Sequence, residues 1–99
     1  MKSESSIKFE YHQVVSQANR LENCSEDLQN VCRELDRLVD TLRTGWEGES
    51  ASLYFEKCNE LYAKIKSASN DLERTSVTIK RTAKIYRDTE LAAIRLVQD

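Results

Sequence analysis

The chain has no proline, and its only two glycines, Gly45 and Gly48, lie close together near the middle of its 99 residues. An internal proline removes a helical hydrogen bond and clashes with the preceding turn, so proline-free stretches can form long helices. Glycine is the residue that most often closes a helix. This distribution predicts two long helices, at about residues 8–43 and 49–95, joined by a turn at 44–48.

Apolar residues recur every seven positions on both sides of this turn. Such spacing places them on one face of an α-helix, whereas a half-buried strand would need a period of two. The predicted fold class is therefore all-α. The side chains predicted to form the core of the hairpin or of its dimer are Val14, Leu21, Leu28, Leu35, Leu42, Phe55, Leu61, Ile65, Leu72 and Ile79.

The central segment Thr44-Gly45-Trp46-Glu47-Gly48 is the only strong break between the two periodic stretches. Gly45 is expected to take a positive φ and close the first helix. A connection this short makes the two helices antiparallel, so residues 1–99 form one helical-hairpin domain. A pivot near residue 45 predicts that facing residue numbers sum to about 90, which places Ala18 opposite Leu72.

Two helices alone cannot cover the apolar surface that this sequence carries. Each half has three adjacent apolar columns, more than one helix–helix seam requires. The remaining face is expected to pack against a second hairpin and give a four-helix bundle. A homodimer is the expected arrangement because two-fold homodimers are the commonest oligomers, and a heterodimer with a related hairpin or an effector is the alternative.

Charge and hydropathy argue against nucleic acid and membrane as partners. The formal net charge is −2, and the densest basic stretch (Lys80, Arg81, Lys84 and Arg87) is typical of a solvated helix face. No apolar run approaches the roughly 18 residues of a transmembrane helix. The first ten residues contain no apolar segment of the kind found in a signal peptide.

Nothing in the sequence indicates catalysis, a metal or a cofactor. His12 is the only histidine and has no evident nucleophile or metal partner. Cys24, Cys32 and Cys58 lack the close pairing of a zinc or redox motif, and their odd number means that not all can pair within the chain. Reduced thiols in the helical core are the favoured interpretation, ahead of a Cys32–Cys58 disulfide.

The motif Trp46-Glu47-Gly48 stands between two long helices in a chain of about a hundred residues. Over essentially its whole length the chain therefore resembles the hundred-residue W-x-G family, the early-secreted-antigen-like proteins of type VII secretion systems. The resemblance implies a small protein made in the bacterial cytoplasm and secreted as a helical dimer without a cleaved signal peptide. It also implies recognition by a membrane-embedded secretion ATPase.

A second motif supports this resemblance. Tyr86-Arg87-Asp88-Thr89-Glu90 matches the family's C-terminal export signal, a tyrosine followed after three residues by Asp or Glu. The resemblance assigns recognition roles to Trp46, Gly48, Tyr86 and Glu90. Residue chemistry gives structural roles beside these, with Trp46 covering the hairpin end and Tyr86 in the main apolar column. In the predicted register Tyr86 and Glu90 lie beyond the first helix, with few partners within the chain.

The two motifs favour an exported substrate that pairs with itself and acts by protein–protein interaction. The alternative is an accessory, chaperone-like hairpin that pairs with a larger secreted effector or toxin. In an antiparallel pair, Trp46 and Gly48 of one copy are expected to meet Tyr86 and Glu90 of the other. A coiled-coil adaptor without an export role ranks third, because it accounts for neither motif.

Overall fold

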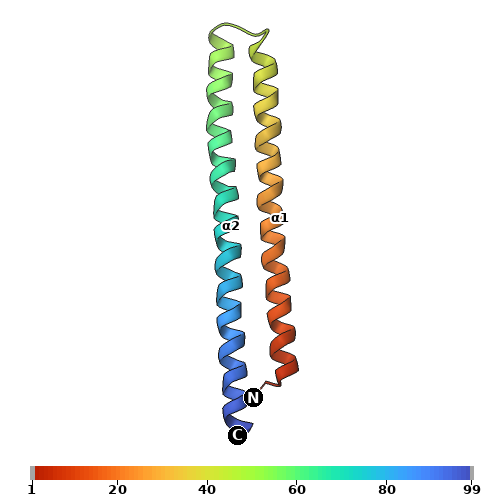
Figure 1. Cartoon of the computed structure of the whole chain (residues 1–99). Helices are drawn as coiled ribbons and strands as arrows, with labels where there is room; N and C mark the ends of the chain where they lie inside the picture. The colour runs from red at the N-terminus through yellow and green to blue at the C-terminus, as the bar shows by residue number, and fades with distance from the viewer. Residues whose placement is uncertain (1, 99) are drawn as a thin grey trace. The chain divides into compact units, whose positions relative to one another are not determined.

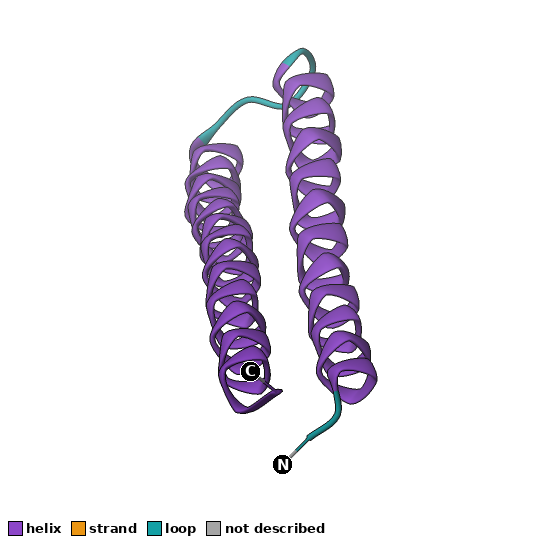
Figure 2. Ribbon diagram, turned by 60° about the horizontal axis from the view of Figure 1, so that its bottom comes forward, coloured by secondary structure: helices purple, strands orange, loops and turns teal. Residues whose placement is uncertain are grey.

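The computed structural model describes residues 2–98, in which two helices, α1 (Glu4–Arg43) and α2 (Glu49–Gln98), are joined by the turn at residues 44–48 (Figures 1 and 2). This confirms the predicted all-α helical hairpin. α1 begins four residues earlier than the sequence pattern suggested, and α2 ends three residues later.

The early start of α1 is explained by a cap at Ser3. The Ser3 hydroxyl accepts a hydrogen bond from the backbone N–H of Ser6 at 3.1 Å, and the Ser3 carbonyl accepts one from Ile7 at 3.1 Å. Serine is a favoured helix-capping residue, and Glu4 places a carboxylate in the first turn, at the positive end of the helix. This cap extends α1 back to within a few residues of the start of the chain.

The chain forms two compact units. The turn unit is Asn23–Leu72 and contains the middle turn with the adjoining parts of both helices. The terminal unit combines Met1–Glu22 with Glu73–Asp99, and so contains the first part of α1 and the last part of α2. We describe each unit by itself.

The seam of the turn unit is made of small side chains. Ser25, Cys32 and Val39 of α1 are buried at seven-residue intervals, and on α2 the buried residues are Ala51, Cys58 and Ser69. The Ser25 hydroxyl donates to the Ser69 carbonyl at 2.8 Å, and the Ser69 hydroxyl donates to the Ser25 carbonyl at 2.9 Å. These reciprocal bonds satisfy both buried hydroxyls and hold the two backbones close together.

The terminal unit continues with the same kind of pairing. Ser76 and Ala18 are fully buried, and the Ser76 hydroxyl donates to the Ala18 carbonyl at 2.8 Å. Ile7 and Ile94 are the large apolar side chains buried in this unit. Lys80 and Glu22 form an ion pair between the helices at 3.0 Å.

These contacts correct the predicted register. Ala18 faces Ser76 rather than Leu72, and the Cys32 thiol reaches the carbonyl of Tyr62, so the facing residue numbers sum to 94. The difference from 90 amounts to one helical turn in the partner helix. Such a shift brings a neighbouring column of α2 to the seam, because Ser76 lies in the seven-residue column of Ser69 and not in that of Leu72. This column contains serines, and for this reason the apolar pattern did not identify it.

The register also decides which apolar residues the single chain buries. None of the ten predicted core residues, all within the described part of the chain, is buried: Val14 and Leu61 are exposed and the other eight are half-buried. The small-residue columns beside them occupy the seam instead. A place for the ten in a dimer core therefore stays a prediction.

Candidate functional site

The turn presents an aromatic cluster. The Trp46 ring packs against Tyr54 and Phe55 of α2, with ring centroids 5.2 and 5.9 Å away. The Arg43 guanidinium lies 5.1 Å from the Phe55 ring centroid, in cation–π contact. Trp46 covers the end of the hairpin as its residue chemistry suggested, yet 38% of its surface is exposed and available for recognition.

The turn requires glycine at Gly48 and not at Gly45. Gly48 has a φ of 114°, the only positive φ among the described glycines, which corrects the expectation for Gly45. α1 instead closes with hydrogen bonds from the N–H groups of Gly45 and Trp46 to the Leu42 carbonyl. A Cβ on Gly48 would meet no atom within 4 Å, so glycine is needed there for the backbone angle rather than for close approach of Trp46.

The three cysteines are free thiols in this structure. Cys32 and Cys58 are buried as expected, whereas Cys24 is exposed, contrary to a place in the core. A side-chain hydrogen bond to Cys58 raises the pKa of Tyr54 above its ordinary value, and electrostatic interaction with Cys58 adds to this shift. Cys58 thus lies beside the aromatic cluster of the turn unit.

An apolar face of the turn unit is left uncovered. The exposed side chains that define this apolar face are Val31, Leu38, Tyr54 and Leu61. On both helices a step of three residues leads from the seam toward this face, turning about 60° round the helix. Because the helices are antiparallel, the same rotation brings both exposed columns to one side of the hairpin, with the half-buried leucines between them.

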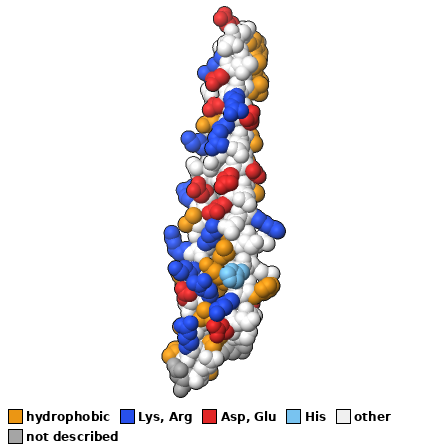
Figure 3. All heavy atoms as spheres, turned by 45° about the vertical axis from the view of Figure 1, so that its right-hand side comes forward, with side chains coloured by type: hydrophobic (Ala, Val, Ile, Leu, Met, Phe, Trp, Pro, Cys, Tyr) orange, Lys and Arg blue, Asp and Glu red, His pale blue; other side chains and the backbone are white. Residues whose placement is uncertain are grey.

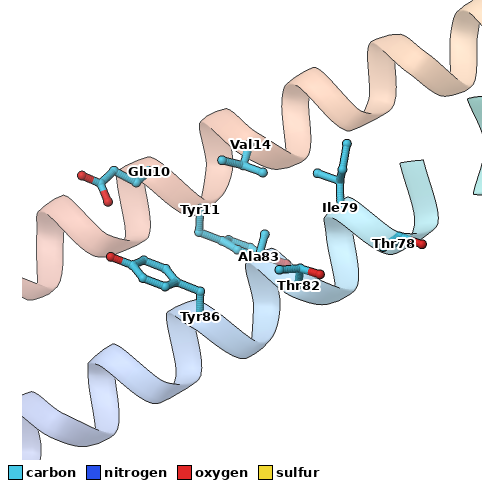
Figure 4. Close-up of a pocket in the computed structure, with 8 residues that line it drawn as sticks. All are labelled: Glu10, Tyr11, Val14, Thr78, Ile79, Thr82, Ala83 and Tyr86. Carbon is cyan, nitrogen blue, oxygen red and sulfur yellow. The ribbon is translucent and has the colours of Figure 1, made fainter. Parts of the chain in front are cut away.

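The terminal unit contains an apolar groove of about 400 Å³ between its two helices (Figure 4). The residues lining the groove are Glu10, Tyr11, Val14, Thr78, Ile79, Thr82, Ala83 and Tyr86. Figure 4 shows the Tyr11 and Tyr86 rings lying between the helices, with the Glu10 carboxylate at one end. Tyr86 of the C-terminal motif therefore forms part of the groove wall.

Tyr86 has contacts with the first helix that the sequence did not predict. The Lys2 ammonium donates hydrogen bonds to the Tyr86 hydroxyl at 3.3 Å and to Glu10 at 2.9 Å. The expectation that Tyr86 has few partners within the chain is therefore wrong, because the corrected register places Tyr86 level with residue 8 and not with residue 4. Tyr86 is still 45% exposed, and Glu90, one turn further along α2, is half-buried.

The four motif residues lie in two different units. Trp46 and Gly48 belong to the turn unit, and Tyr86 and Glu90 belong to the terminal unit. Sequence reasoning missed Lys2 and the α1 residues around Tyr86, Glu10 and Tyr11. The one signal that could have indicated them is Ser3 followed by Glu4, a helix-start pattern that brings the first helix level with the C-terminal motif.

The remaining polar surface is typical of a solvated helical protein. In the view of Figure 3, Lys and Arg side chains alternate with Asp and Glu. Among residues 2–98 no group of three metal-ligating side chains is close enough to hold an ion. The same residues include no helix with the length and apolar character needed to cross a membrane.

Comparison with known proteins identifies the family. The family described as proteins of 100 residues with WXG matches residues 6–91. The match covers most of the chain and includes both motifs, so the chain belongs to this family. No curated protein and no solved structure matches significantly. Membership identifies the chain as a small protein of the type VII secretion pathway, whose members generally pair as dimers.

Proposed function

Since the chain is a member of the W-x-G family, we propose that it is a substrate of a type VII secretion system, exported as a folded homodimer, and that it acts by protein–protein interaction rather than catalysis. The observation that carries this proposal is the family match over residues 6–91, which contains both Trp46-Glu47-Gly48 and Tyr86–Glu90.

The apolar face of the turn unit supports the dimer. Its exposed side chains are large, and half-buried leucines lie between them on the same side of the hairpin. A second copy presents the same face, so a two-fold axis brings like against like and buries both surfaces. The product is a four-helix bundle in which those predicted core residues that lie in the turn unit become fully buried.

Recognition by the secretion ATPase is assigned to the exposed motif residues. Trp46 and Gly48 form the aromatic turn, and Tyr86 and Glu90 form the C-terminal motif. In this proposal the protein is made in the bacterial cytoplasm and leaves the cell without a cleaved signal peptide. Folding precedes export, because the turn geometry around Gly48 and the groove around Tyr86 exist only in the folded hairpin.

An export assay tests the proposal. Tagged protein is quantified in cells and culture medium of a type VII-competent bacterium and of the same strain lacking the secretion ATPase. The variant Tyr86→Ala/Glu90→Ala is expected to reduce export at least tenfold. Its matched control is Ile85→Ala/Thr89→Ala, two exposed neighbours with the same spacing, which should be exported normally. Normal export of the Tyr86/Glu90 variant, or export without the ATPase, would overturn the proposal.

A further inference from the structure

The start of the chain contacts the C-terminal motif. Lys2 lies in the short segment before α1, and its ammonium group is 3.3 Å from the Tyr86 hydroxyl oxygen. The same nitrogen lies 5.7 Å from the centroid of the Tyr86 ring. Lys2 therefore contacts both the polar end and the aromatic ring of this tyrosine.

Glu10 holds Lys2 in this position. The Lys2 ammonium is 2.9 Å from a carboxylate oxygen of Glu10, which also lines the groove beside Tyr86. These hydrogen bonds to Glu10 and Tyr86 raise the pKa of Lys2 above its ordinary value, so the ammonium is fully charged at neutral pH. Lys2 thus bridges a carboxylate of α1 and the tyrosine hydroxyl of α2.

Arg87, the next residue of the motif, contacts a side chain of α1. The Arg87 guanidinium lies 4.2 Å from the centroid of the Tyr11 ring, a close cation–π contact, and its Nε is 3.0 Å from Asp88. Two consecutive residues of the C-terminal motif are therefore positioned by side chains from the first turns of the chain. The motif is presented by a paired helix and not by a free C-terminal tail.

We propose that the export signal of this chain is a surface formed by two segments, in which Lys2 and Glu10 position Tyr86 for recognition by the secretion machinery. This inference rests on the proposed function and adds to it two residues outside both sequence motifs. The signal is then readable only when the terminal unit is folded. Tyr86 and Glu90 contact the secretion machinery, whereas Lys2 and Glu10 act indirectly by positioning Tyr86.

The first test compares single charge removals in the full chain. Lys2→Gln and Glu10→Gln should each reduce export roughly two- to fivefold, the size of effect expected from an exposed ion pair. Lys8→Gln is the matched control, because Lys8 pairs at 3.0 Å with Glu4 of the same helix. Lys2→Arg should retain export. Helix content and solution mass should be unchanged in all four variants.

A double-mutant cycle separates positioning of Tyr86 from a general effect of charge. Tyr86→Phe removes the hydroxyl that accepts the Lys2 hydrogen bond and keeps the ring. If Lys2 acts through that hydroxyl, adding Lys2→Gln to Tyr86→Phe should cost little further export, because interacting positions are not additive. Lys8→Gln added to Tyr86→Phe should show only the product of the two single effects.

The outcomes distinguish this inference from the proposed function. If Lys2→Gln and Glu10→Gln are exported as well as Lys8→Gln while Tyr86→Ala/Glu90→Ala is retained in cells, the two-segment signal is overturned and the proposed function stands. Fully independent effects of Lys2→Gln and Tyr86→Phe would also overturn it. If the wild-type protein is exported without the secretion ATPase, both proposals fall.

Discussion

The turn unit and the terminal unit use the same two helices in different ways. In both units small residues such as Ser69 and Ser76 bring the helices together, and large apolar residues remain exposed, such as Leu61 in the turn unit and Ile85 in the terminal unit. In the terminal unit, cations also link the helices, through Lys2 with Tyr86 and Arg87 with Tyr11, beside the apolar groove.

The difference indicates a division of roles within one hairpin. A seam of small side chains leaves the large apolar side chains free for a partner, which suits a pairing surface. Charged and aromatic side chains around a groove suit a surface that another protein must recognise. The predictions below test this division, beginning with the largest expected effect.

The apolar face of the turn unit should control association. Leu38→Glu/Leu61→Glu would place four carboxylates, two from each copy, in the proposed interface at about 2 kcal/mol each, weakening the dimer by roughly five to six orders of magnitude. Sedimentation at several concentrations measures this. Asn30→Glu/Asn59→Glu adds the same charges at exposed positions away from the apolar face and should leave the dimer intact. Equal effects of the two pairs would contradict the assignment of the face.

The serine pair should control the close approach of the helices. Ser69→Leu overpacks a seam position that is 1% exposed and removes the hydroxyl that donates to the Ser25 carbonyl. We expect a loss of about 3 kcal/mol in the free energy of unfolding, measured by urea denaturation at fixed protein concentration. Ser67→Leu, at an exposed position of the same helix, should change it by less than about 0.5 kcal/mol.

The two turn glycines should differ sharply. Gly48→Ala adds a Cβ to a residue with a φ of 114°. We expect it to lower the free energy of unfolding by about 1–2 kcal/mol. Gly45 has no positive φ and open space around it, so Gly45→Ala should be neutral within about 0.5 kcal/mol. Thermal unfolding of both variants measures the difference. A larger loss for Gly45→Ala would show that the turn has another geometry.

The smallest effect concerns acid stability at the start of α1. A hydrogen bond from Lys8 lowers the pKa of Glu4 below its ordinary value of 4.5. Because the pKa of Glu4 is lower in the folded state, its ionised carboxylate stabilises the fold above pH 4.5. This stabilisation is lost as the pH falls through the folded-state pKa. Carboxyl NMR titration should show Glu4 below 4.5 in the wild type and at its ordinary value in Lys8→Gln. An unshifted Glu4 in the wild type would refute the contact.

The sequence contained enough information for the helices and the turn. Proline-free heptads on both sides of Gly45 and Gly48 leave few other folds, and the large apolar columns indicate which faces need cover. The register could not be predicted from the apolar pattern, because the column that α2 presents to α1 contains Ser69 and Ser76. The register depends on the hydrogen bonds between Ser25 and Ser69. The polarity of these two serines alone would place them at the surface.

The candidate site was predictable only in part. Trp46, Gly48, Tyr86 and Glu90 stand out as motif residues in the sequence. The contacts of Tyr86 depend on the register of the two helices and on the cap at Ser3, which sets where α1 begins. Lys2 belongs to no periodic pattern, so its position beside Tyr86 required the three-dimensional structure.

Solution mass by light scattering, with circular dichroism on the same chromatographic peak, tests the central claim most directly. We predict a helical dimer of about twice the 11.5 kDa of one chain, with the apolar faces of two turn units in contact. A helix-poor or heterogeneous monomer would contradict the homodimer. It would identify the chain as half of a heteromeric complex, in which a larger secreted protein covers the apolar face.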